Sequence, residues 1–435
     1  SAPEGRGRDP SRTTVDANGN VWAGNRAESS DGQGSIIHIG LLENGQCVER
    51  NGIEGIQTST GLGDVKGWSN TGGADDSGGV STADDECIIH YVRTAGTRVR
   101  TVAVDGANNV WAGGYPDRIH ALYNSSGALV PNTQFSHGCG GYGGLVDGYG
   151  ILWSSSGPSL GNYNTALLRY DPVTKSWACL NHGWYGYGLG IDNNGAIWHT
   201  NWTWNTAMKI NPNGSLASIT GTGGASNDRG VAVTSADNHV WVANSGGSDV
   251  SRLDNEGTLL TTIGVGTTPT GVAVDAAGKV WVTNLTSHDV MRIDPSTNTV
   301  DMTVDLNAVK YNGVDAGPYN YSDMTGSTVT APPSAGTWQV VHDSGIPGAT
   351  WGSVSWTGDE PGDSSLTVTA ASSTDGVVFG LPVAVTDGAD LTVDDGQYLK
   401  VTVNFARAST GESPVLYDLT IQANRPPDCS NATQI

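Results

Sequence analysis

Short apolar runs of strand length, separated by turns rich in Gly, Asn and Asp, recur along most of the chain. The stretch GVAVDAAGKVWVTNLTSHDVMRIDPST, residues 271–297, holds two such runs with the turn DAAG between them, and a third run that ends at a Pro. Alternating apolar positions favour half-buried strands, and Asp, Asn and Gly supply the positive φ of a tight hairpin turn. Pro cannot continue a strand ladder. The pattern therefore predicts antiparallel strands joined by hairpins.

The core of this pattern, apolar-Asp-x-x-Gly-x-apolar-Trp, recurs six times with varying fidelity. Its tryptophans are Trp22, Trp111, Trp153, Trp198, Trp241 and Trp281. From Trp111 onward they lie about 40 to 45 residues apart, the length of one four-stranded propeller blade. A lone blade cannot bury both faces, so blades must stack in a ring with each Trp as a wedge between neighbours. We expect an all-β chain with a six- to seven-bladed β-propeller, the seventh blade coming from YNYSDMTGSTV (319–329) or from residues before Ser1.

The interval between Trp22 and Trp111 is about twice as long as the others, which indicates an acidic insertion at about residues 45–95. Ser81 followed by Asp84 resembles a capping box, so TADDECIIHYVRT (82–94) is expected to form a short helix that ends before Gly96. Two segments of the insertion carry hard oxygen ligands suited to calcium. The candidate ligands are Glu49, Asn51, Glu54, Asp75, Asp76, Asp84 and Glu86. Both segments depart from a full calcium loop, so a solvated acidic loop is the alternative.

The composition fits a turn-dense β protein and narrows the range of partners. Gly accounts for 62 of the 435 residues, and the net charge of −22 disfavours binding to nucleic acid or to an anionic membrane. No apolar run approaches the length of a membrane-spanning helix. The sequence begins at Ser1 rather than Met, which suggests that a targeting segment has been removed or that a longer chain precedes it.

Five cysteines are spaced without any CxxC motif, so zinc ribbons, thioredoxin chemistry and c-type haem are not indicated. Cys47 with Cys87 and Cys139 with Cys179 are plausible disulfides, and they would imply an oxidising compartment outside the cell. Cys429 is left over. Six Asn-x-Ser/Thr sequons are candidate glycosylation sites, although chance matches are common in a chain rich in Asn, Ser and Thr. They are Asn124, Asn201, Asn213, Asn284, Asn320 and Asn431.

The blade units, over roughly residues 11–329, resemble those of NHL-type and streptogramin-lyase-like (virginiamycin B lyase-like) β-propellers. The segments DPSRTTVDANGNVWAGNR, CVERNGIEG…DEC and YNYSDMTG also resemble large secreted bacterial proteins that carry such propellers beside adhesion-like domains. In those proteins NRPPDCS resembles the lead-in to a further immunoglobulin-like module. The resemblance then implies that Cys429 pairs downstream, in a longer polypeptide.

The resemblance also implies where a lyase site would lie. In such lyases a His and acidic residues on the channel-facing strands place a divalent metal and a general base. The equivalent positions in this chain are Ser11, Arg100, Tyr142, Tyr187, Arg229 and Thr270. Proton removal next to a carbonyl needs a base, and none of these is a His or Glu. His137, His182 and His199 show no metal-ligand spacing, which favours structural roles for them.

Arginines beside aromatic rings at these axial positions, with Trp184 and Tyr185 nearby, could bind a sugar, an aromatic ligand or a carboxylate. They could equally be packing residues around a narrow axis. The residue types do not decide between these two interpretations.

After the repeats, TGSTVTAPPSAG (325–336) reads as a linker, placed at 330–336, and six short alternating runs follow between residues 337 and 424. They predict a β-sandwich that resembles discoidin-type or fibronectin-like modules. Residues 1–10 and 425–435 are expected to be connectors.

Two functional hypotheses follow. The first is a non-catalytic extracellular or cell-surface protein, structural or adhesive, that self-associates or contacts neighbouring domains of a longer chain, with filament assembly through its terminal segments and with glycans as a further partner class. The second is a streptogramin-lyase-like or glycan-active propeller that uses the axial pocket.

Overall fold

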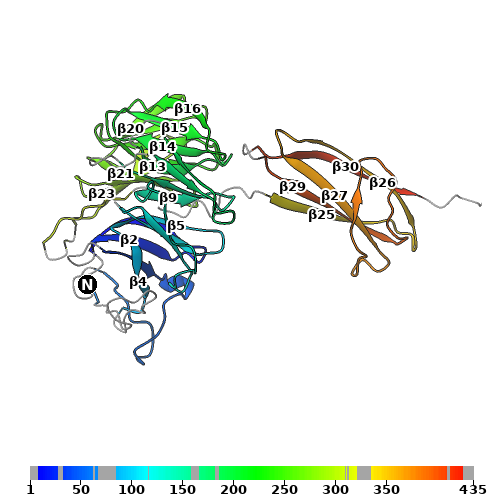
Figure 1. The fold of residues 1–435 in the computed structure, drawn as a ribbon, viewed down its shortest axis with the longest axis horizontal. Coiled ribbons are helices and arrows are strands. Elements are labelled where there is room, and N and C mark those ends of the chain that lie inside the picture. Colours follow the sequence, from blue (N-terminus) through cyan, green and yellow to red (C-terminus); the bar gives the residue numbers. More distant parts are fainter. Residues whose placement is uncertain are drawn as a thin grey trace, which may run out of the picture. The chain divides into compact units, whose positions relative to one another are not determined.

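The structure is a computed structural model in which residues 8–27, 33–61, 64–66, 85–115, 117–157, 166–181, 186–308, 310, 313–320, 335–408 and 412–424 are described. The chain divides into two compact units, Ser1–Pro332 and Pro333–Ile435. Both units consist of strands and loops, apart from a single 3-10 turn η2 (Leu42–Asn44) among the described residues (Figure 1).

The first unit contains six four-stranded antiparallel sheets among its described residues. The first is β1 (Arg8–Val15), β2 (Val21–Ala27), β3 (Gln33–Ile39) and β4 (Ile88–Thr97). The second is β5 (Val99–Val104), β6 (Val110–Gly114), β7 (Ile119–Tyr123) and β8 (Phe135–Ser136). The third is β9 (Gly143–Val146), β10 (Leu152–Ser155), β11 (Leu167–Tyr170) and β12 (Trp177–Leu180).

The remaining three sheets repeat the same up-and-down order. The fourth is β13 (Gly186–Ile191), β14 (Ile197–Asn201), β15 (Thr206–Ile210) and β16 (Leu216–Gly221). The fifth is β17 (Asp228–Val233), β18 (Val240–Asn244), β19 (Asp249–Leu253) and β20 (Leu259–Gly264). The sixth is β21 (Pro269–Val274), β22 (Val280–Asn284), β23 (Asp289–Asp294) and β24 (Thr299–Asp305).

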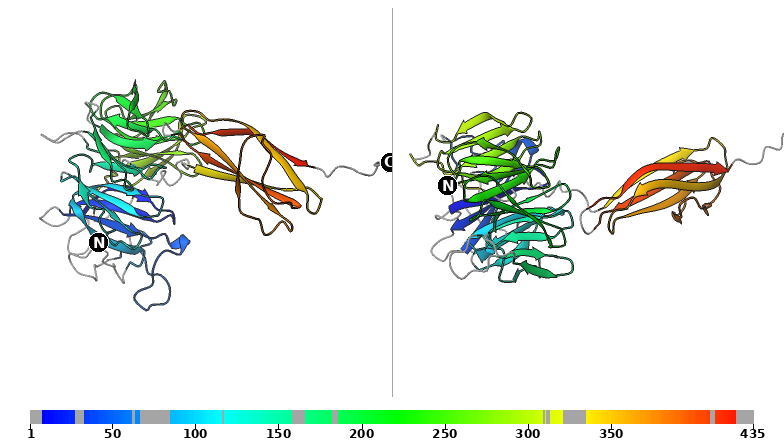
Figure 2. Two further views of the ribbon diagram at one scale, coloured as in Figure 1. Left: turned by 45° about the vertical axis from the view of Figure 1, so that its right-hand side comes forward. Right: turned by 90° about the horizontal axis from the view of Figure 1, so that it is seen from above.

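The sheets are the blades of a β-propeller. Their first strands contact one another in the order β1, β5, β9, β13, β17, β21, so these strands line the axis. Figure 2 shows the sheets of this unit in chain order, from blue through cyan to green. The prediction of an all-β chain with at least six blades is confirmed. Residues 321–329, from the stretch considered for a seventh blade, lie outside the described residues.

In every described blade except the fifth, where Thr234 takes its place, the Asp of the repeat motif organises the turn that precedes the Trp strand. Oδ1 of Asp147 accepts hydrogen bonds from the backbone N–H groups of Tyr149 (2.9 Å) and Ile151 (3.0 Å), and Oδ2 accepts one from Nε1 of Trp153 (2.7 Å). Asp275 repeats this arrangement, with Trp281 donating over 2.8 Å. In the third, fourth and sixth blades one carboxylate thus satisfies two turn amides and the indole, which explains the spacing of Asp and Trp there. In the first blade Asp16 contacts His38 instead.

Each Trp, except that of the last blade, is almost fully buried against the blade that follows. Trp153 packs with Leu189, Ile197 and Met208 of the fourth blade, and Trp241 with Val280 of the sixth. The cross-strand partner of the Trp in blades three to six is a cation over the ring, such as Arg169 at 5.6 Å from the Trp153 ring centroid. The predicted wedge role is confirmed. Trp281 is half-buried.

The expected helix at residues 82–94 is wrong. Residues 88–97 form β4, which pairs with β3 as the outer strand of the first blade. The stretch IIHYV is rich in β-branched and aromatic residues, and the open edge of β3 offers it backbone partners, so sheet packing outweighs a weak capping signal. The acidic excursion therefore leaves the first blade after its third strand and returns as its fourth.

The second unit is a β-sandwich of six strands, the number expected from the alternating runs. One sheet has the order β25 (Ala335–Asp343), β29 (Tyr398–Ala406), β27 (Ser365–Ser373) and β28 (Val383–Val385). The other pairs β26 (Thr350–Asp359) with β30 (Val415–Asn424). Val354, Leu399, Val401 and Val403 are fully buried between them.

Candidate functional site

Aromatic side chains from consecutive blades meet at the propeller axis. Tyr142 precedes β9 and Tyr187 lies in β13, and both are at least 95 % buried. Their hydroxyl groups lie 3.2 Å apart, with Tyr142 donating to Tyr187. Tyr115 packs edge-on against Tyr142, and Trp202 stacks on Tyr187. We call these four rings, together with Tyr319, the axial aromatic cluster.

Arginines from several blades lie over these rings. The guanidinium carbon of Arg100 is 4.6 Å from the Tyr142 ring centroid, and that of Arg12 is 5.1 Å from it. Arg229 lies 4.8 Å from the Trp202 centroid. Guanidinium groups gain favourable energy from aromatic faces when water is excluded, so these contacts stabilise the centre of the ring.

The centre of the cluster is occupied by the chain itself. Tyr319, from the segment that follows the sixth blade, places its hydroxyl 2.6 Å from that of Tyr187. The Tyr319 ring also receives Arg229 at 5.4 Å and Arg12 at 5.9 Å. Tyr319 therefore links the first, fourth and fifth blades.

The same segment bridges the sixth blade and the first. Oγ1 of Thr270 in β21 donates to the carbonyl oxygen of Pro318 (3.1 Å), and Nδ2 of Asn320 donates to Oγ1 of Thr13 in β1 (2.9 Å). Each described blade is built from consecutive strands, so the chain ends are not interleaved within one blade. Residues 313–320 thus join the sixth blade to the first, and the partly buried Tyr319 packs against the axial aromatic cluster.

Four of the six axial positions taken from the sequence, Arg100, Tyr142, Tyr187 and Arg229, meet in this cluster. Thr270 lies at the bridge, and Ser11 is buried beside Arg12. Trp184, Tyr185 and His182 lie outside the described residues. Sequence reasoning missed Arg12, Tyr115, Trp202 and Tyr319. Arg12 directly follows a predicted axial position, whereas Tyr319 lies outside the repeats and carries no comparable signal.

The cluster supplies donors and aromatic faces rather than a proton acceptor. Phenols and guanidinium groups keep their protons at neutral pH. Asp228, next to Arg229 in β17, is fully buried, and burial raises its pKa to about 7. Its Oδ2 accepts a hydrogen bond from Oγ1 of Thr222 (2.7 Å). In the second blade, burial lowers the pKa of His120 to about 4, so this imidazole is neutral at pH 7.

The predicted structural histidines occupy packing positions where they are described. His137 stacks between Phe135 and Trp177, at centroid distances of 4.7 and 4.2 Å. His199 is 98 % buried in β14 and directly faces Gly186. In the described part of the chain, no group of three His, Cys, Asp or Glu side chains comes together that could hold a metal ion.

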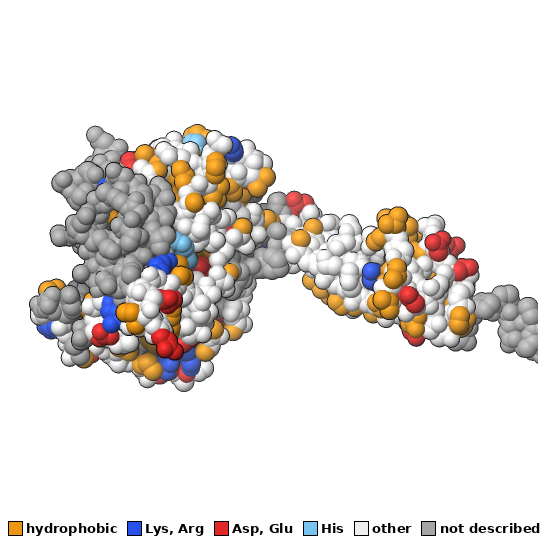
Figure 3. All heavy atoms as spheres, turned by 90° about the horizontal axis from the view of Figure 1, so that it is seen from below, with side chains coloured by type: hydrophobic (Ala, Val, Ile, Leu, Met, Phe, Trp, Pro, Cys, Tyr) orange, Lys and Arg blue, Asp and Glu red, His pale blue; other side chains and the backbone are white. Residues whose placement is uncertain are grey.

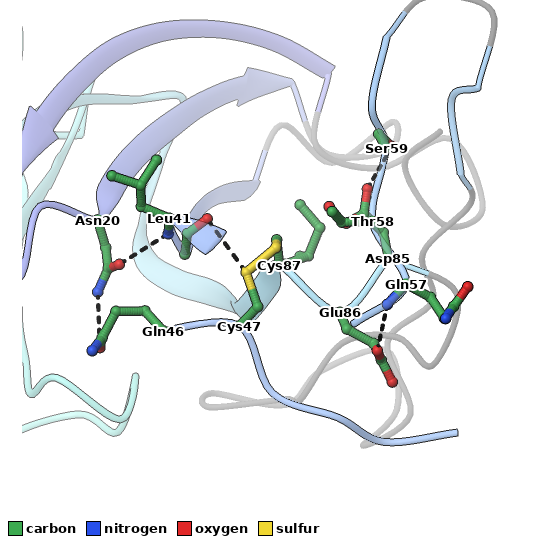
Figure 4. The surroundings of a disulfide bond; sticks show 12 residues. Asn20, Leu41, Gln46, Cys47, Gln57, Thr58, Ser59, Asp85, Glu86 and Cys87 are labelled. Atoms are coloured by element: carbon green, nitrogen blue, oxygen red, sulfur yellow. Dashed lines mark hydrogen bonds between the residues drawn. A yellow bond between two sulfur atoms is a disulfide. The ribbon is translucent and has the colours of Figure 1, made fainter. Parts of the chain in front are cut away.

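Both predicted disulfides are present, Cys47–Cys87 and Cys139–Cys179. The first ties the start of the acidic excursion to its return (Figure 4). Beside it, Asp85 accepts hydrogen bonds from the hydroxyl groups of Thr58 (2.8 Å) and Ser59 (2.6 Å). The excursion is therefore anchored at its base by a covalent bond and by a buried carboxylate.

The calcium candidates of the excursion bind backbone amides. Glu86 is buried and accepts from the N–H groups of Arg50 (2.6 Å) and Gln57 (2.8 Å), and Glu49 accepts from that of Gly52 (2.7 Å). Oδ1 of Asn51 accepts from Ile53 (2.8 Å), and Glu54 is exposed. Asp75, Asp76 and Asp84 lie outside the described residues. Calcium at this excursion stays a prediction.

The sequons differ in access. Asn201 and Asn284 are fully buried, so a glycan has no room there in this fold. Asn213 is exposed at a turn, Asn124 is half-buried at another turn, and Asn320 is part of the bridge. Asn431 lies outside the described residues. Within the residues that the structure describes, no helix is long and apolar enough to span a bilayer.

Comparison with known proteins supports the fold. The sequence matches no protein-family model and no curated protein. Among solved structures, virginiamycin B lyase from Staphylococcus aureus aligns with a TM-score of 0.51 and 16 % identity, over 71 % of this chain and 87 % of the lyase. A catalytically inactive variant of that lyase with quinupristin aligns equally well, over 72 % and 89 %. At this identity the likeness shows a shared propeller fold.

Proposed function

We propose that this chain is a non-catalytic extracellular protein with a structural or adhesive role, in which the propeller is a rigid module. The observation that carries the proposal is the Tyr319 hydroxyl 2.6 Å from that of Tyr187, because the chain's own side chain occupies the place where a propeller of this fold could receive a ligand. The surrounding Arg and Tyr side chains lack a proton acceptor for acid–base chemistry.

Two further features support an extracellular location. Both disulfides close loops of 40 residues and would persist in an oxidising compartment. The net charge of −22 keeps the chain soluble and disfavours anionic surfaces. Calcium at the acidic excursion, glycans on Asn213 or Asn124, and contacts of residues 1–10 and 425–435 with neighbouring copies belong to this proposal as additional features.

The test is an activity assay on quinupristin, the compound found with the inactive variant of the structural neighbour. Quinupristin is incubated with divalent metal ions and with the wild-type chain, the Tyr319→Ala variant or the S. aureus lyase as positive control, and the products are measured by mass spectrometry. We expect product from the lyase alone. Turnover by the wild-type chain that is lost in Arg229→Ala would contradict the proposal.

A second candidate function is ligand binding at the axis after displacement of Tyr319. It is favoured by the buried Nε and Nη1 atoms of Arg229, which have no hydrogen-bond partner among the described residues. Such donors suit a carboxylate or a sugar hydroxyl. Calorimetry with benzoate and with glucose separates the two functions: binding to the wild-type chain with micromolar affinity favours this candidate, and binding confined to Tyr319→Ala favours the first.

A further inference from the structure

The sandwich presents an apolar loop tip at one end. Val377, Val378 and Leu381, in the loop between β27 and β28, are 80 %, 73 % and 91 % exposed. The tip is held in place rather than loosely attached. Oδ1 of Asp375 accepts the N–H groups of Val377 and Val378 (both 2.9 Å), and the N–H of Gly380 donates to the carbonyl of Ser372 (3.0 Å). We call residues 377–381 the apolar tip.

The sandwich also leaves its core open along one side. Among the described residues, β25 pairs with β29 alone and β30 with β26 alone, so each has one edge without a strand partner. Between these edges lies a cleft of about 410 Å³ lined by Trp338, Phe405, Leu416, Tyr417, Asp418 and Leu419. Trp338 is 42 % exposed although it lies on the same sheet face as the fully buried Val401 and Val403. We call this the edge cleft.

The apolar tip and the edge cleft lie at opposite ends of the sandwich. Ser373, directly before the tip loop, pairs with Tyr398, which also faces Asp343 at the end of β25. Phe405 of the cleft pairs with Gly336, close to the start of β25. A projection at one end and a recess at the other cannot meet within one copy, but they can meet between copies. In Figure 3 hydrophobic side chains (orange) gather on this unit with acidic ones (red) beside them.

Charge at the two surfaces is complementary. Residues 335–424 contain eleven Asp and Glu but two Lys and Arg. Lys400, one of the two, lies at the tip, with its Nζ 4.5 Å from the Phe379 ring centroid. Asp418 lines the cleft. A cation on the projection and a carboxylate in the recess favour this pairing over contacts between two acidic flanks.

We propose that copies of this chain associate head to tail, the apolar tip of one copy inserting into the edge cleft of the next. This inference rests on the proposed structural function and deepens it, because it names a second copy as the partner. A contact between two different surfaces of one protein extends without limit unless its rotation closes a ring. Salt screens the attraction between Lys400 and Asp418 as well as the repulsion between the acidic flanks. Because the eleven acidic residues outnumber this single pair, the net effect of salt should be to promote association.

The test uses sedimentation velocity of the full chain at micromolar to millimolar concentrations, in 50 and 500 mM NaCl. We expect concentration-dependent oligomers that increase with salt. The tip variant Val377→Ser/Val378→Ser/Leu381→Ser should weaken association by at least about tenfold, because apolar burial is lost. The cleft variant Tyr417→Ser/Asp418→Lys should do the same. All five side chains are exposed, so both variants are expected to fold.

The matched control is Val173→Ser, which removes an 86 % exposed Val at a propeller turn and should leave association unchanged. Mixing is the decisive measurement. The tip variant keeps its cleft and the cleft variant keeps its tip, so a mixture of the two should form one-to-one dimers at concentrations where each variant alone is monomeric. Combining Lys400→Asp with Asp418→Lys should restore part of the association lost in either change alone.

The proposal is overturned if the wild type is monomeric throughout, if the tip variant associates like the wild type, or if the mixture stays monomeric. Oligomers that disappear on removal of residues 1–10 or 425–435, but persist in the tip variant, would assign assembly to the terminal segments. A negative result for head-to-tail association does not change the outcome of the quinupristin assay. The two experiments therefore test the association and the proposed lack of catalysis separately.

Discussion

The propeller and the sandwich differ in how completely their own side chains cover their apolar interiors. The propeller fills its axis with its own Tyr319, which contacts Tyr187, Arg229 and Arg12. The sandwich leaves Trp338, a residue on its core-facing side, 42 % exposed at an open edge. A space that a chain fills itself contributes to stability, whereas an apolar space left open is where a partner is to be sought.

The blades also differ from one another. In the third blade Trp153 is fully buried against the next blade, whereas Trp281 of the sixth blade is half-buried. Among the described residues, the bridge of residues 313–320 joins the sixth blade to the first at this position. We expect this junction between the sixth and first blades to be the least stable part of the propeller.

The largest effect is expected from the wedge residues. Trp153→Ala should lower the free energy of unfolding by about 3–5 kcal/mol, because it leaves a large cavity between two blades. Trp281→Ala should cost less than about half of that, since its ring is already partly in water. Urea unfolding of both variants measures the difference. Equal losses would contradict the asymmetry between blades three and six.

The buried Asp228 should make the free energy of unfolding depend on pH. Its folded pKa of about 7 lies above that of an unfolded Asp, so between pH 4 and 7 the folded state holds a proton that the unfolded state has lost. Stability from this group is therefore lost as pH rises through this window, by on the order of 2–4 kcal/mol. Asp228→Asn should be more stable than the wild type at pH 8 and equal to it at pH 4. The control is Asp301→Asn, an exposed carboxylate paired with Arg292, which should not change the profile in this way.

The hydroxyl of Tyr319 provides a smaller test of the filled axis. Tyr319→Phe removes the hydrogen bond to Tyr187 and should lower the free energy of unfolding by about 1 kcal/mol. Tyr417→Phe, at a 68 % exposed position of the sandwich, is the matched control and should change nothing measurable in stability. If both variants unfold like the wild type, the phenol of Tyr319 does not hold the axis together.

The smallest effect is expected at the apolar tip. Val377→Ser should change the free energy of unfolding by less than about 0.5 kcal/mol, because the side chain is 80 % exposed. Its effect should fall on association instead. Thermal unfolding of the dilute Val377→Ser protein measures the change in stability. A large loss would mean that the tip packs within its own copy.

The blades could be predicted from the sequence because the short repeat motif determines both the hairpin turn and the position of the Trp. The Asp–Trp spacing satisfies two turn amides and one indole. The positions five residues before the motif's Asp position, where the resemblance to lyases implied a site, include Arg100, Tyr142, Tyr187 and Arg229, which lie on or directly before the inner strands. Tyr319 could not be found in this way, because its place is set by contacts with distant blades. The strand at 88–97 was mistaken for a helix because the open edge of β3, which decides its conformation, is remote in sequence. The edge cleft and the apolar tip emerge only from the strand order of the sandwich.

One structure determination tests the central contrast directly: cryo-electron microscopy of the wild-type chain at a concentration and salt that favour association. The account predicts density for the Tyr319 ring between Tyr187 and Arg229 at the propeller axis, and density for residues 377–381 of a neighbouring copy in the cleft between β25 and β30. An axis without Tyr319, holding another molecule, together with an empty cleft in a monomeric particle, would contradict it.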